Sequence, residues 1–78
     1  MPDSFQLAHH AMQIRHLEQA ERNVAEGERH IAEQEERVVQ LARGGHNVTE
    51  ARKLLDNFYA SQALHIQHRD RIRKELVR

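Results

Sequence analysis

The feature that most constrains this chain is a spacing of small and apolar residues that alternates between three and four. One series runs from Leu17 to Leu41 and a second from Val48 to Leu76. These intervals are those of the a and d positions of a heptad, so each series predicts a helix with a narrow packing stripe. We call the two stripes together the seam. Its positions are Leu17, Ala20, Val24, Gly27, Ile31, Gln34, Val38 and Leu41 in the first series, and Val48, Ala51, Leu55, Phe58, Gln62, His65, Arg69, Ile72 and Leu76 in the second.

A glycine pair and an asparagine between the two series predict a tight turn. Gly44 or Gly45 is suited to the left-handed conformation that ends many helices. Asn47, with Glu50 three residues later, has the spacing of a capping box at a helix start. The same spacing occurs near the beginning of the chain, at Asp3 and Gln6.

These signals predict helices over about 4–43 and about 48–76, joined by a turn at 44–47. A connection this short between long helices gives an antiparallel hairpin. The predicted fold class is therefore all-α, a coiled-coil-like two-helix hairpin. With 78 residues, the chain is expected to form one domain, 1–78.

Folding the hairpin symmetrically about the turn aligns residues whose numbers sum to about 92, which places Gly27 opposite His65. The ends of the hairpin are then apolar and its middle is polar. Polar seam residues lower stability but disfavour wrong alignments, so we interpret them first as an alignment device. The predicted polar seam consists of Gly27, Gln34, Gln62, His65 and Arg69.

Within the first helix, Gly27 is expected to leave room for a side chain of the second helix. An interior glycine costs a helix about 1 kcal/mol relative to alanine, so it calls for such a reason. His30 falls beside the seam and is expected to be a surface residue paired with Glu26 one turn earlier. Two further pairs with this spacing are Glu18–Arg22 and Glu33–Arg37.

Apolar residues outside the seam predict a homodimer. A lone hairpin covers one stripe on each helix, so the surplus needs a partner, and two hairpins packed as a four-helix bundle would provide one. The start of the first helix also extends beyond the second helix in this alignment. The candidate dimer contacts are Phe5, Leu7, Met12, Ile14, Leu54, Tyr59, Leu64 and Ile66.

Seven histidines are many for this length, and His65 and His68 have a spacing that can chelate a transition metal. The companion ligands of known metal motifs are missing, so no metal is expected, and these two residues are weak candidates only. Histidines near Arg69 also suit a pH sensor. A histidine-based metal or pH sensor is accordingly one alternative function.

Charge is balanced overall but unevenly distributed. Residues 1–46 hold five arginines against eight acids, and residues 47–78 hold seven basic residues against four acids. The segment 68–78 is basic and helical, so a nucleic-acid-binding protein is a second alternative. Net neutrality and the scarcity of aromatic residues make nucleic acid an unlikely partner.

Motifs for catalysis and for cofactors are absent from the sequence: there is no cysteine, no glycine-rich phosphate loop and no serine-nucleophile elbow. We therefore expect no enzyme, no catalytic residues and no cofactor. No apolar stretch is long enough for a membrane span, and no signal peptide is recognisable, so a cytoplasmic location without membrane contact is expected. The primary expectation is a small helical adaptor or regulator that acts as a homodimer and binds another protein.

Three stretches carry a resemblance to known sequences: AERNVAEGERHIAEQ, ARGGHNVTEARKLLDNF and LHIQHRDRI. Together they resemble short, uncharacterised helical-hairpin proteins of alphaproteobacteria such as the rhizobia, over residues 16–73. The chain departs from that pattern at Asn23, where histidine is common, and at Val48, where threonine is usual. The resemblance implies a bacterial cytosolic setting and the hairpin, and it implies no activity.

Overall fold

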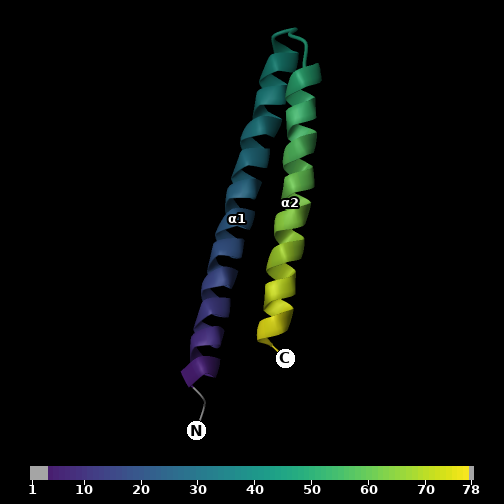
Figure 1. The fold of residues 1–78 in the computed structure, drawn as a ribbon. Helices are drawn as coiled ribbons and strands as arrows, with labels where there is room; N and C mark the ends of the chain where they lie inside the picture. Colours follow the sequence, from purple (N-terminus) through teal and green to yellow (C-terminus); the bar gives the residue numbers. More distant parts are fainter. Residues whose placement is uncertain (1–3, 78) are drawn as a thin grey trace.

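The fold is an antiparallel pair of long helices, α1 (Ser4–Arg43) and α2 (Thr49–Leu76), in a computed structural model that describes residues 4–77. The helices lie side by side and form a rod of 67 × 15 × 14 Å (Figure 1). The all-α prediction is confirmed, and no strand occurs within residues 4–77. Helix α2 begins one residue later than predicted. The predicted cap at Asp3 lies outside the described residues.

The end of α1 is closed by backbone hydrogen bonds around the second glycine of the pair. Gly45 has a φ of +73°, whereas no positive φ occurs at Gly44. The His46 amide donates to the Leu41 carbonyl (2.9 Å), and the Gly45 amide donates to the Ala42 carbonyl (3.1 Å). These two bonds form a Schellman motif, which requires the left-handed residue at Gly45.

The N-cap position of α2 is Val48, which makes no side-chain cap hydrogen bond. The predicted cap residue, Asn47, lies one residue earlier. Its Oδ1 accepts a hydrogen bond from the Thr49 amide at 2.8 Å. Glu50 does not complete the capping box, because its carboxylate bonds to Lys53 at 3.4 Å. Both charged groups are well exposed, so this ion pair contributes little to stability.

The core of the hairpin is small and follows the predicted seam. Every predicted seam position is buried or half-buried. The buried apolar side chains are those of Ala20, Val24 and Ile72. Two glutamines, Gln34 and Gln62, are buried with them at 7% exposure each. Polar side chains are therefore buried within the predicted seam.

The alignment of the two helices differs from the prediction by about one seam step. Gly27 lies against Gln62 and not opposite His65. The contact of Gln13 with Glu75 (3.4 Å) shows the same offset near the open end. The turn explains this offset. Its backbone hydrogen bonds fold the chain back over the last turn of α1. Helix α2 therefore begins beside the last turn of α1 and not level with its final residue.

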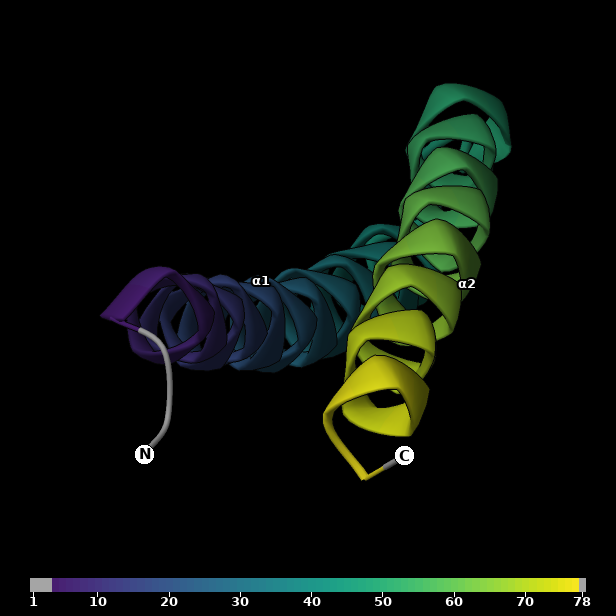
Figure 2. The same cartoon turned by 60° about the horizontal axis from the view of Figure 1, so that its bottom comes forward.

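The beginning of α1 projects beyond the end of α2 (Figure 1), and Figure 2 shows the two helix axes inclined to each other. Gln13 is the residue of α1 that reaches Glu75, near the end of α2. The side chains of Phe5 and Leu7 on the projecting turns are exposed. The overhang is shorter than the sequence predicts, because α2 extends far enough for His9 and His10 to line a hollow with Leu76.

Candidate functional site: a polar groove between the helices

Two buried glutamines tie the helices together across the seam. The Gln34 Nε2 donates to the Ala51 carbonyl of α2 at 2.9 Å. The Gln62 Nε2 donates to the Val24 carbonyl of α1 at 2.9 Å. In each case a side-chain amide reaches a backbone oxygen of the opposite helix, so the two bonds also tie the helices at one relative alignment.

Gly27 makes room for the amide of Gln62. A Cβ atom built on Gly27 would overlap the Oε1 and Cδ of Gln62. The predicted role of Gly27 as a packing notch is thus confirmed, but the predicted occupant, His65, is wrong. The heptad spacing identifies the notch, and only the geometry of the turn decides which residue of α2 lies against it.

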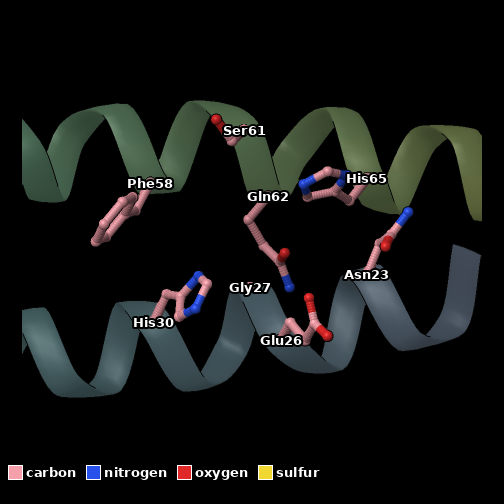
Figure 3. A pocket seen from close by; sticks show the side chains of 8 residues that line it. All are labelled: Asn23, Glu26, Gly27, His30, Phe58, Ser61, Gln62 and His65. Atoms are coloured by element: carbon pink, nitrogen blue, oxygen red, sulfur yellow. The ribbon is translucent and has the colours of Figure 1, made fainter.

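Beside this notch lies a groove of about 250 Å³ between the helices (Figure 3). Four residues of α1 line it: Asn23, Glu26, Gly27 and His30. Four residues of α2 complete it: Phe58, Ser61, Gln62 and His65. The groove brings three predicted polar seam residues together, namely Gly27, Gln62 and His65.

Several polar groups of the groove lack partners among residues 4–77. The Gln62 Oε1 is buried and accepts no hydrogen bond. Buried polar atoms are almost always bonded, so this oxygen is an exception that calls for an explanation. Neither the Glu26 carboxylate nor the half-buried His65 ring has a hydrogen bond or ion pair in this part of the chain. The groove therefore presents unused hydrogen-bonding capacity.

His30 does not form the predicted pair with Glu26. Its ring lies against Phe58 of α2, with ring centroids 5.9 Å apart and planes tilted by 35°. Phe58 is a half-buried seam residue, so His30 covers it from the edge of the groove. The other two predicted acid-first pairs are also absent within residues 4–77, where Glu33 pairs with Arg29 (3.7 Å).

The remaining polar candidates lie apart from the groove. Arg69 is half-buried, and its guanidinium bonds to Asp70 at 3.0 and 3.1 Å. His68 is exposed. No three histidine, aspartate or glutamate side chains within residues 4–77 are grouped as a metal ion would require. Within the basic segment 68–78, Arg73 pairs with Glu21 of α1 at 3.9 Å.

The eight candidate dimer contacts are all exposed, but they do not form one surface. Tyr59 and Ile66 lie two turns apart on one side of α2, whereas Leu54 and Leu64 point to other sides. The Tyr59 hydroxyl donates to the Glu35 carboxylate of α1 at 3.0 Å, so this side of α2 continues onto α1. We call the combined surface the tyrosine face. Its exposed apolar residues are Ala25, Ala32, Val39, Tyr59, Ala63 and Ile66.

The hydrogen bond to Glu35 raises the pKa of the Tyr59 phenol above its ordinary value. Desolvation and the nearby charges of Glu35 and Asp56 act in the same direction. A phenol that donates to a carboxylate resists deprotonation, since the phenolate could not donate and would face a like charge.

Comparisons with protein-family models, curated proteins and solved structures find no match. The resemblance to alphaproteobacterial hairpin proteins therefore stays a prediction. Neither of the helices within residues 4–77 has an apolar stretch that could cross a membrane.

Proposed function

We propose that this protein is a non-enzymatic helical interaction module that acts as a homodimer. The observation that carries the proposal is its surface area. The chain exposes 6284 Å², whereas a compact monomer of 9.2 kDa is expected to expose about 4,900 Å². The excess exceeds the roughly 800 Å² that each partner buries in a standard protein interface.

The tyrosine face is the surface that we assign to the dimer contact. Its alanines allow close approach of another helix, and Tyr59 and Ile66 provide larger side chains to bury. A two-fold pairing of this face with itself gives a four-helix bundle in which each hairpin covers the other's exposed stripe. The projecting turns of α1 then present the exposed Leu7 side chain to a further protein.

The proposal is tested by placing a charge on the tyrosine face. Ile66→Glu buries a carboxylate in the proposed interface and is expected to yield a monomer in sedimentation velocity experiments. Leu64→Glu is the matched control: Leu64 is also an exposed apolar residue of α2, but it lies on another side of the helix, so this variant is expected to remain a dimer. Circular dichroism confirms that both variants are helical.

Two results would contradict the proposal. A wild-type chain that is monomeric at micromolar concentration would exclude the homodimer. A dimer that is lost in Leu64→Glu and retained in Ile66→Glu would exclude the tyrosine face as its contact surface.

A further inference from the structure

The groove between α1 and α2 has one acidic residue, Glu26, among its lining residues. Neither lysine nor arginine is among its lining residues. It presents the Glu26 carboxylate, and the Gln62 side chain, which is 7% exposed, points into it with an oxygen that accepts no hydrogen bond. A group that donates hydrogen bonds and carries positive charge would satisfy both residues, whereas an anion would be repelled by Glu26.

Aromatic surface at the same groove restricts the shape of that group. Phe58 and the ring of His30 lie together at one end of the groove (Figure 3). A flat cation stacks on such rings. The volume of about 250 Å³ is below the range of roughly 300–1,000 Å³ for drug-sized ligands, so it suits a group of side-chain size.

We propose that this groove binds a guanidinium group. The planar cation stacks on Phe58, donates one N–H to the Gln62 Oε1, and places its charge beside Glu26. The Gln62 Oε1 is closed to solvent in the free protein and lies against Gly27, so a neighbouring side chain must move for the ligand to reach it. We assign this movement to the half-buried His65 ring, which lines the groove and makes no hydrogen bond within residues 4–77. Gly27 is required as well, because a side chain there would push the Gln62 amide out of position.

The test uses the full chain labelled with ¹⁵N, titrated with ethylguanidinium and, separately, with ethylammonium. Ethylguanidinium is expected to shift the side-chain amide signals of Gln62 in a saturable manner. Ethylammonium carries the same charge without a flat face, and we expect it to bind about tenfold more weakly. Equal binding of both cations, or linear shifts without saturation, would overturn the proposal.

Three variants locate the binding site. Gln62→Met removes the acceptor oxygen at similar volume and is expected to weaken ethylguanidinium binding at least about tenfold. Glu26→Gln removes the charge from an exposed position and is expected to weaken binding about two- to fivefold. Gln34→Met is the matched control, because Gln34 has the same exposure and the same kind of cross-helix bond but lies outside this groove. Unchanged binding in Glu26→Gln, whose fold does not depend on that charge, would contradict the site.

The guanidinium has two possible sources: a free small molecule, or an arginine side chain of a second copy. If the arginine of a second copy fills the groove, ethylguanidinium shifts the dimer towards monomer in sedimentation velocity experiments; if a free molecule fills it, the mass is unchanged. The site itself does not depend on the proposed dimer. Binding must therefore persist in the monomeric Ile66→Glu variant, and its absence there, with the helices intact, would overturn the groove as an independent site.

Discussion

At the scale of single residues, Gly27 and Gln62 form the most specific contact of this hairpin. A glycine inside a helix lowers stability by about 1 kcal/mol relative to alanine. Here its missing side chain admits an amide that bonds to the Val24 carbonyl across the seam. The two residues are therefore expected to be energetically coupled.

A double-mutant cycle measures this coupling. In the wild type, Gly27→Ala raises helix propensity by about 1 kcal/mol. It also breaks the Gln62 hydrogen bond, which costs about 1 kcal/mol. The two effects offset each other, so the free energy of unfolding is expected to change little. In a Gln62→Ala background the same substitution is expected to stabilise by about 1 kcal/mol. Urea unfolding at one fixed protein concentration gives the free energies of unfolding of all four proteins in the cycle. The larger substitution Gly27→Leu is expected to destabilise the hairpin. An equal effect of Gly27→Ala in both backgrounds would refute the coupling.

Tyr59 allows a second prediction at this scale, because it is the only tyrosine and there is no tryptophan. Its ultraviolet titration is expected to show a pKa above the ordinary phenol value of about 10, as the bond to Glu35 requires. Glu35→Gln removes the carboxylate and is expected to lower this pKa, with Glu36→Gln as the neighbouring control. Because the pKa is raised in the folded state, the stabilisation is present below the unfolded value and is lost as the pH rises through the folded value. Identical titration curves for the wild type and Glu35→Gln would show that Glu35 does not raise the pKa of Tyr59.

At the scale of the elements, the turn determines how the helices align. The left-handed Gly45 closes α1, and the amide of His46 reaches back to Leu41. The Asn47 side chain then accepts a hydrogen bond from the first residue of α2. These three steps follow one another within a few residues, so the relative position of the helices is decided locally.

Comparing substitutions at Gly44 and Gly45 tests this role of the turn. Gly45→Ala forces a Cβ into the left-handed region and is expected to destabilise by about 1 kcal/mol. Gly44→Ala is the control, because its backbone has no positive φ, and the neighbour its Cβ would meet is the movable His46 side chain. Thermal unfolding of the two variants distinguishes them. A larger loss in Gly44→Ala than in Gly45→Ala would show that the turn has another conformation.

The spacing of the sequence predicts the helices and the seam well, because heptad periodicity is a local property of each helix. Every seam residue from Leu17 to Leu76 is at least half-buried. The partner of Gly27 could not be predicted in the same way, since it depends on how far the turn folds back over α1. The stacking of His30 on Phe58 depends on the same alignment, so an error in the turn changes the residues assigned to the groove.

At the scale of the whole molecule, the polar middle of the seam limits stability and specifies alignment. Polar groups buried in a seam are often less stabilising than apolar residues of similar size, yet they disfavour shifted pairings. Gln34 and Gln62 have this character, and the oxygen of Gln62 is left without a partner.

Replacing both glutamines by leucine tests this role. The Gln34→Leu, Gln62→Leu double variant is expected to raise the free energy of unfolding by about 1–3 kcal/mol. It is also expected to broaden the distribution of oligomers, because the two cross-helix bonds that disfavour other alignments are gone. Calorimetry and sedimentation velocity report the two effects. Lower stability with one sharp oligomeric state would show that the glutamines stabilise the hairpin and do not select its alignment.

The thin core and the large exposed surface lead to the central claim, that this hairpin is completed by a second copy. Sedimentation equilibrium across a range of micromolar concentrations, with thermal unfolding of the same samples, tests it most directly. The account predicts a mass twice the 9.2 kDa of one chain and a melting temperature that rises with protein concentration. A mass of one chain at every concentration, with a constant melting temperature, would contradict it.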